Sequence, residues 1–265
     1  MPNLTLAAIT AALIAFVLLG LRARHTSGLD DYLTARGTQD GRTLGLSFLA
    51  SGMGAWILFA PPEIGAFVGP IAVAGYAIGS ALPFIILGLV GPAVRRRLPA
   101  GRSLTEFTAS RFGAGFRYWV AALSVLYMLC FLAAELTAVG AITGLLSDVD
   151  ARYAIVAVAV ATLVYTTAGG LRASLVTDRW QAGLLIALIA TVGTAAFVFA
   201  PAAPSADSGS GLPTTPLGNA LGVALTLIIA VTAANLFHQG YWQRVWAASD
   251  NGALRRGALI GGVTT

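Results

Sequence analysis

Long apolar runs recur along the chain and predict a helical membrane protein. A helix that crosses a membrane needs about 20 predominantly apolar residues. Runs of this kind predict a leading helix at 4–21 and core helices at about 44–66, 70–92, 118–146, 153–169, 180–200 and 218–240, with the start of a further helix from 257. No basic residue precedes the first run and no small-residue cleavage pattern follows it, so we expect a retained anchor and not a signal peptide. We expect one transmembrane domain over 1–265.

The composition supports the membrane assignment. Of 265 residues, 57% are hydrophobic and 10% are charged, whereas soluble domains carry about 25% charged residues. This balance excludes an ordinary soluble enzyme, a disordered protein and a disulfide-stapled secreted module. The single cysteine, Cys130, excludes an intrachain disulfide. The sequence has no His-Glu-x-x-His motif and no Gly-rich phosphate loop with lysine, so we expect a transporter and not an enzyme.

The basic residues predict the orientation. All sixteen are arginine, and fifteen of them lie on one side if the predicted spans alternate across the membrane. Only Arg152 lies on the other side. Cytoplasmic loops carry the excess of basic residues, so we expect the N-terminus outside. Because the arginines are distributed among membrane loops in this way, the net charge of +5 does not indicate a nucleic-acid partner.

A helix break is predicted inside the run at 44–66. Ser, Gly and Ala crowd its first half, and Pro61 and Pro62 remove two backbone donors shortly before Glu63. Irregular backbone at membrane depth occurs where it is buried in protein or lines a cavity, and transporters use such broken helices at their binding sites. The alternative is a simple proline kink with Glu63 at the outer interface.

Five further polar residues stand out at or near membrane depth. Glu135 lies mid-span, either in a transport pathway or paired to a neighbouring helix. Asn235, His238 and Gln239 offer donors and acceptors to an uncharged polar solute, although an interfacial polar and aromatic belt would look similar. Asp178 is predicted just before the helix at 180–200, where it is either a helix cap or a cation contact at the inner mouth.

Five segments in order along the chain together resemble the sodium:solute symporter family. They are 29–36; the broken-helix segment from 46 to 63; 104–107 before 111–113; 169–173 with 177–178 and 181; and 243–244 with 247–248. Within the family, the chain looks most like the urea active transporter branch, whose members also carry polyamines. The residues that suggest this branch are 51–55 with 62–63, 134–136 and 235–237.

The resemblance implies a fold and residue roles. Family members have two inverted repeats of five helices, preceded by an extra helix that places the N-terminus outside. By resemblance, the backbone carbonyls of Ala50 and Met53 contribute to a sodium site, and Asn235 contacts the substrate. His238 occupies the place of an aromatic inner gate.

Three further residues are candidates for the binding site. Trp56 and Glu63 are expected on its outer side, and Gln239 is a further candidate for substrate binding.

One departure from the family is the number of helices. The chain has the leading helix, six core helices and the start of a seventh, so it resembles the N-terminal portion of a symporter. The eighth core helix supplies hydroxyl ligands to the sodium site in the family. We therefore predict that the 265-residue chain alone does not couple sodium to solute, and tight sodium binding by the isolated chain would contradict this.

The combined prediction is an all-α, multi-span symporter of the plasma or inner membrane. It would carry sodium together with a small polar solute, urea or a related compound, by alternating access in the lipid bilayer. The alternatives are a passive facilitator or channel, which would not depend on a cation gradient, and a membrane sensor or assembly subunit.

Overall fold

The computed structural model describes residues 2–24, 28–199 and 215–265, which are helical apart from short connections. Their only paired strand-like residues are Gln39 and Ala248, which form an isolated bridge. The elements are α1 (Pro2–Arg22), α2 (Leu29–Thr34), α3 (Gly41–Gly52), the 3₁₀ turn η1 (Ala55–Leu58), α4 (Ala60–Phe67), α5 (Pro70–Arg97), α6 (Leu104–Phe112), α7 (Ala114–Leu146), α8 (Ala151–Phe199), α9 (Leu217–Asn235), α10 (Gln239–Ala247) and α11 (Asn251–Thr264).

The long helices have the length and composition of membrane spans. In the described residues, α5, α7, α8 and α9 each meet this criterion, and the bent pair formed by α3 with η1–α4 makes a fifth. The 49-residue α8 contains a kink at Gly170 and is therefore two helical legs. The described apolar part of α1 is shorter, at Leu6–Arg22. The prediction of an all-α, multi-span membrane protein with a broken first core helix is confirmed.

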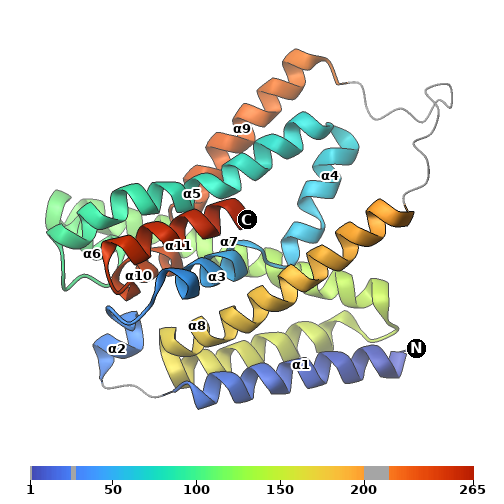
Figure 1. The fold of residues 1–265 in the computed structure, drawn as a ribbon, viewed down its shortest axis with the longest axis horizontal. Helices are drawn as coiled ribbons and strands as arrows, with labels where there is room; N and C mark the ends of the chain where they lie inside the picture. The colour runs from blue at the N-terminus through green and yellow to red at the C-terminus, as the bar shows by residue number, and fades with distance from the viewer. Residues whose placement is uncertain (1, 25–27, 200–214) are drawn as a thin grey trace.

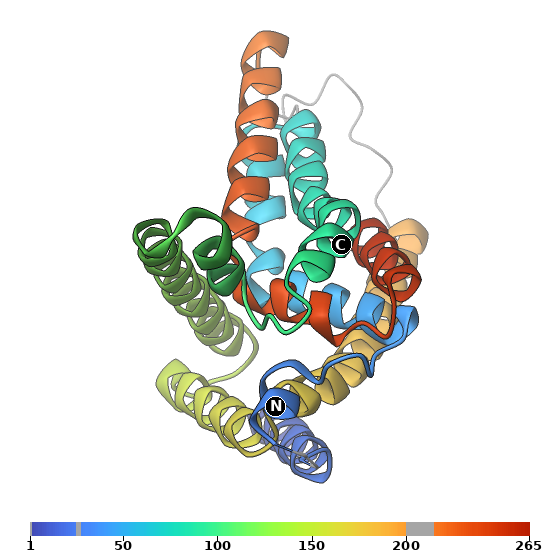
Figure 2. The ribbon, with the colours of Figure 1, turned by 90° about the vertical axis from the view of Figure 1, so that its left-hand side faces the viewer.

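The helices form a bundle around α3, α10 and α11. Figure 1 shows α1 beside the first leg of α8 along one edge, and α5 with α9 along the other. Figure 2 shows the same bundle end-on, with α10 and α11 between these edges. Glycines allow the closest approaches, because a Cβ at Gly75 would lie 2.5 Å from the Cα of Ala224, and one at Gly261 would lie 2.5 Å from the Cβ of Phe48.

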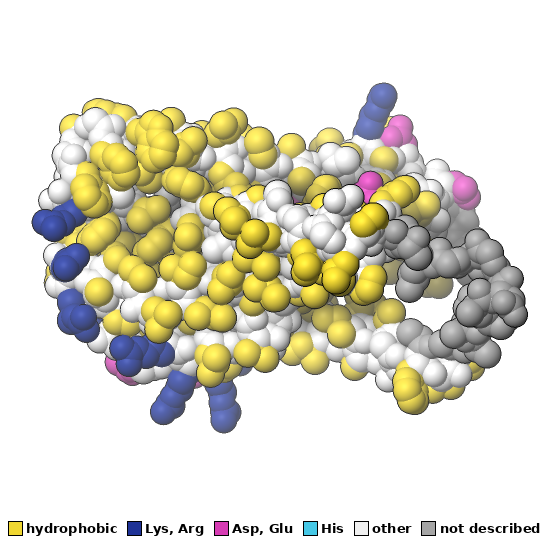
Figure 3. All heavy atoms as spheres, turned by 90° about the horizontal axis from the view of Figure 1, so that it is seen from above, with side chains coloured by type: hydrophobic (Ala, Val, Ile, Leu, Met, Phe, Trp, Pro, Cys, Tyr) yellow, Lys and Arg dark blue, Asp and Glu magenta, His cyan; other side chains and the backbone are white. Residues whose placement is uncertain are grey.

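Charge is segregated between the ends of the bundle. In Figure 3 most of the basic side chains visible on that face gather at and near one end of the molecule, where the chain enters α3 and leaves α5, and one basic side chain stands at the opposite end beside acidic ones. This distribution agrees with the arginine count, and an N-terminus on the outside stays a prediction. Arg244 departs from the prediction that the arginines lie in solvated loops. It lies inside α10 and is only 3% exposed.

Several predicted helix boundaries move in the structure. The helix predicted at 218–240 ends at Asn235, and a separate helix begins at Gln239. The last helix begins at Asn251 and not near 257, with Asp250 as its N-cap. The second leg of α8 begins directly after Gly170, so Asp178 lies within a helix and does not cap one.

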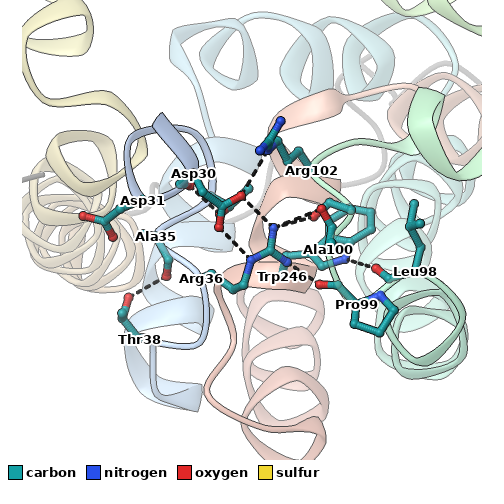
Figure 4. Close-up of polar contacts among 12 residues, drawn as sticks. Asp30, Asp31, Ala35, Arg36, Thr38, Leu98, Pro99, Ala100, Arg102 and Trp246 are labelled. Carbon is teal, nitrogen blue, oxygen red and sulfur yellow. Dashed lines mark hydrogen bonds and ion pairs between the residues drawn. The ribbon is translucent and has the colours of Figure 1, made fainter. Parts of the chain in front are cut away.

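The short helix α2 ties several connections together at the arginine-rich end. Figure 4 shows Asp30 between Arg36 and Arg102, with Arg36 also donating to backbone carbonyls of the α5–α6 connection. The hydrogen bond from the Arg36 guanidinium holds the pKa of the Asp30 carboxyl well below its usual range. On the other side of α2, Arg172 binds Asp31 at 2.7 Å, which joins α2 to α8 just after its kink.

The kink itself requires glycine. Gly170 adopts φ 58° and ψ −145°, a region that other residues rarely enter. A Cβ there would lie 2.3 Å from the carbonyl oxygen of Tyr32. The α2–α8 contact and the α8 kink therefore depend on the same residue.

We predict that Gly170→Ala destabilises the protein. The backbone strain alone costs of the order of 1–3 kcal/mol, and the clash with Tyr32 adds to it. The thermal midpoint of purified protein in detergent should fall by several degrees, whereas Gly183→Ala, at a helical glycine with open space around it, should change it little. Equal midpoints for the two variants would contradict the strain argument.

Candidate functional site

The break between α3 and α4 is built by local sequence. α3 ends at Gly52, Met53 leaves the helical conformation (φ −109°, ψ 74°), and after Gly54 the chain resumes as η1. The two halves are bent by 59°. Pro61 and Pro62 stand in the first turn of α4, where a missing amide hydrogen costs nothing because the first-turn amides have no partner within the helix. The prolines therefore stand at the start of α4, and Gly52 and Gly54 mark the break.

Glu135 of α7 accepts a hydrogen bond from the backbone at the start of η1, in the second half of the broken helix. The Ala55 amide donates to Glu135 Oε2 at 2.6 Å. A carboxylate is favoured at this place because the first amides of a helix carry partial positive charge. A Cβ on Gly54 would lie 2.1 Å from Glu135 Oε1, so only glycine allows the carboxylate to approach this closely.

A buried ion pair holds the first half of the broken helix. Arg244 Nη2 lies 2.8 Å from Asp178 Oδ2, and the two side chains are 3% and 9% exposed. Arg244 also donates from Nε to Ser47 Oγ at 2.7 Å and from Nη2 to Ser51 Oγ at 2.6 Å. Ser47 in turn donates to Asp178. The network joins α3, α8 and α10 in a single cluster of charge-assisted hydrogen bonds.

Two cavities meet at the break. The α2-side cavity has a volume of about 590 Å³, and its polar lining residues are Tyr32, Ser51, Glu135, Thr162, Thr166, Ser174, Asp178, Gln181, His238, Gln243 and Arg244. The α4-side cavity has a volume of about 420 Å³, and its polar and aromatic lining residues are Trp56, Glu63, Tyr76, Ser80, Tyr127, Phe131, Glu135, Asn235 and Tyr241. Gly54, Phe131 and Glu135 line both cavities, and we call these three residues the partition.

The predicted substrate residues divide between different places. Trp56, Glu63 and Asn235 line the α4-side cavity together. Gln239 does not join them, because its amide donates to Ser124 Oγ at 2.8 Å and it lines a third cavity between α7 and α10. The structure thus brings together three of the four residues and separates the fourth.

Asn235 is oriented by its neighbours. Tyr127 donates its hydroxyl to Asn235 Oδ1 at 2.8 Å, and Asn235 Nδ2 donates to the Val231 carbonyl at 3.0 Å. The amide retains one N–H and one lone pair for a further partner. It lies at the last residue of α9, where the chain turns toward α10.

The predicted gate residue, His238, lines the α2-side cavity beside the partition. Its ring stacks on Tyr241 with centroids 4.0 Å apart and meets Phe131 edge-on at 5.4 Å. The side chain is buried, and its Nδ1 has no hydrogen-bond partner among the described residues. Aromatic packing therefore fixes the ring while one polar atom stays available.

The two carbonyls predicted to bind sodium lie where α3 ends. Ala50 is in the last turn of α3 and lines the α2-side cavity, and Met53 is the C-cap. Carbonyl groups at a helix C-terminus carry partial negative charge and have no amide one turn further along. Oxygen atoms of this kind coordinate sodium in transporters with broken helices. The described residues contain no cluster of three or more His, Cys, Asp or Glu side chains that would suit another metal.

Comparison with known proteins agrees with this arrangement. Residues 32–211 match the model of the sodium:solute symporter family. The chain belongs to this family. The family and the span-length helices make it an integral membrane protein. It is also 32% identical over 237 residues to the spermidine transporter DUR31 of Candida albicans, across 89% of this chain and 45% of that protein. The chain thus spans about half the length of this relative.

The most important polar residue that the sequence analysis misplaced is Arg244. The predicted spans place it in a loop, because it follows the apolar run at 218–240. Its neighbours carried part of the signal of burial, since Tyr241, Trp242, Val245 and Trp246 are large apolar residues of the same short helix and all four are buried. A buried arginine requires a partner, and in this chain the partner is Asp178.

We predict that Asp178 and Arg244 are energetically coupled. Removal of one partner of a buried ion pair costs about 3–5 kcal/mol because the other charge is left unpaired. Asp178→Asn and Arg244→Gln should each lower the thermal midpoint markedly, and the double variant should lose less than the sum of the two. Arg179→Gln, next to Asp178 but exposed, is the matched control and should change little. Strictly additive losses in the double variant would contradict the coupling.

Proposed function

We propose that the protein moves a small polar solute together with sodium by alternating access at the partition. The observation that carries this proposal is that two cavities on opposite sides of a broken helix share Gly54, Phe131 and Glu135. A rocking motion that widens one cavity and narrows the other would transfer a solute past these residues. We place the protein in the plasma or inner membrane with its N-terminus outside.

Sodium is the proposed coupled ion. Its site would include the carbonyls of Ala50 and Met53, and the family membership supports this choice. An ion held there contacts the end of α3 next to the hinge at Gly54, so its binding would bias the angle between α3 and η1. Sodium and solute would then affect one structural element, which is the physical requirement for coupled transport.

Urea is the first proposed solute. It is uncharged, so its site needs paired donors and acceptors in place of an ion partner. Asn235 supplies both, and Tyr127 fixes the orientation of its amide. Trp56 borders the same cavity and offers a flat apolar surface for a planar molecule.

A polyamine is the second proposed solute. The α4-side cavity is lined by the carboxylates of Glu63 and Glu135 and by the rings of Trp56, Tyr76 and Tyr127. Carboxylates and aromatic faces both attract ammonium groups. The Candida relative is named as a spermidine transporter, which favours the same candidate.

His238, Asp178 and Arg244 are proposed to act on the α2-side of the pathway. His238 would gate passage from the partition into the α2-side cavity, which it lines. The Asp178–Arg244 pair holds α10 against α3 and α8. A widening of the α2-side cavity would therefore have to move these helices as one unit or break the pair.

We predict sodium-dependent uptake that requires Asn235. Cells that make the protein in its natural reading frame, including any sequence after Thr265, should accumulate labelled urea or labelled spermidine. Replacement of sodium by choline should abolish accumulation. Asn235→Ala should reduce uptake about 10-fold, because an unmade hydrogen bond in a buried site costs about 1–3 kcal/mol. Asn219→Ala, at an exposed position of the same helix, is the matched control.

The alternatives give different results. Equal uptake with and without sodium would indicate a passive facilitator. Absence of uptake of both solutes, with the protein present in the membrane, would exclude both candidates and leave the family membership unchanged.

A further inference from the structure

Glu135 is a carboxylate that lines three cavities within the described part of the chain. It lies on α7 at membrane depth and borders the α2-side cavity, the α4-side cavity and the cavity that contains Gln239. Among residues 2–24, 28–199 and 215–265, no ion pair involves Glu135. Its hydrogen bonds come from neutral backbone amides, those of Ala55 and Trp56.

A charge in this position needs stronger compensation than an amide provides. A carboxylate within a membrane span is costly and is usually paired with a cation or placed on a transport pathway. An ammonium group adds the Coulomb attraction of a full opposite charge to its hydrogen bond, whereas a backbone amide offers only a dipole. The buried guanidinium on the α2-side, that of Arg244, is already bound to Asp178. Glu135 therefore has acceptor capacity that an incoming cation would satisfy.

The surroundings of Glu135 fit an organic cation. Phe131 shares the partition with it, and Trp56, Tyr127 and Tyr241 line the α4-side cavity that it borders. Ring faces attract alkylammonium groups and also accommodate the methylene chain. On the α2-side of the partition, the buried His238 presents the unpartnered Nδ1. The unmet hydrogen-bond capacity of this buried ring is a second polar feature beside the partition.

We propose that Glu135 selects a cationic amine and that amine binding releases the broken helix. The inference rests on the proposed transport function. In the structure Glu135 holds Ala55, and through it the hinge at Gly54. An alkylammonium group presents charged donors to the same carboxylate and replaces the Ala55 amide. The hinge then loses its restraint toward α7, and the angle between α3 and η1 can change.

In this mechanism the choice between amines and urea is made by the same step that changes the angle between α3 and η1. A neutral solute such as urea offers only neutral N–H donors, which compete with the Ala55 amide on equal terms and leave the restraint in place. A cation has the advantage in binding free energy that the exchange requires. Glu135 would thus distinguish amines from urea at the step that changes the conformation and not only at the step of binding.

The test measures transport of two solutes by variants of one residue. Labelled spermidine and labelled urea are the probes, and the protein is made in its natural reading frame. Glu135→Gln keeps the size and removes the charge, so KM for spermidine should rise about tenfold or more. KM for urea should change less than about threefold on the same scale. Glu135→Asp should retain part of the spermidine affinity. A merely structural role would lower transport of both solutes together, and that outcome would overturn the proposal.

The controls separate this inference from the proposed function. Asp148→Asn makes the same chemical change at an exposed position beyond the end of α7 and should leave both KM values unchanged. Wild-type protein that carries urea but not spermidine would overturn the inference and leave the proposed function standing. Wild-type protein that carries neither would overturn both.

A binding measurement covers the case in which Glu135→Gln does not fold. Spermidine should raise the thermal midpoint of purified wild-type protein more than an equal concentration of urea, and it should raise that of Glu135→Asp by a smaller amount. Equal stabilisation of wild-type protein and Glu135→Asp would overturn the proposal.

Discussion

A helix broken inside a membrane leaves backbone groups that neither lipid nor a continuing helix can satisfy, and the structure is organised around this constraint. The Ala55 amide on one side of the break is bound by Glu135 from α7. On the other side, the carbonyl of Ser51 accepts the hydroxyl of Tyr241 at 3.3 Å, and the Ser51 side chain accepts from Arg244. Helices far apart in sequence, α7 and α10, therefore supply the hydrogen-bond partners of the backbone on the two sides of the break.

The Asp178–Arg244 pair shows how this organisation extends through the bundle. Two buried charges are expensive to desolvate, so the pair is weak evidence for overall stability. Its geometry is demanding, however, since Arg244 must reach α3 and α8 from α10 at the same time. A pair of this kind specifies one arrangement of the three helices and penalises others. The packed glycines along α5 and α11 permit the same close approach without any polar cost.

The ion pairs around α2 are more exposed than the buried Asp178–Arg244 network. Asp30, Arg36 and Arg102 are partly exposed, and their attraction is weakened by water and salt. These ion pairs link separate segments. They join α2 and the residues after it to the α5–α6 connection on one side, and Asp31 joins α2 to α8 near its kink on the other.

The sequence by itself determined the spans, the broken helix and the family. Hydrophobic runs, glycine pairs and prolines act on the chain locally, and the symporter motifs lie within short segments. Only the tertiary structure decided that the predicted helix at 218–240 ends at Asn235, that Gln239 lies apart from Asn235, that Asp178 is no cap, and that Arg244 is buried. Those outcomes depend on contacts such as Arg244 with Ser47, 197 residues apart, and Gln239 with Ser124, 115 apart. Local pattern carries no information about such pairs, because they form only when separate helices meet.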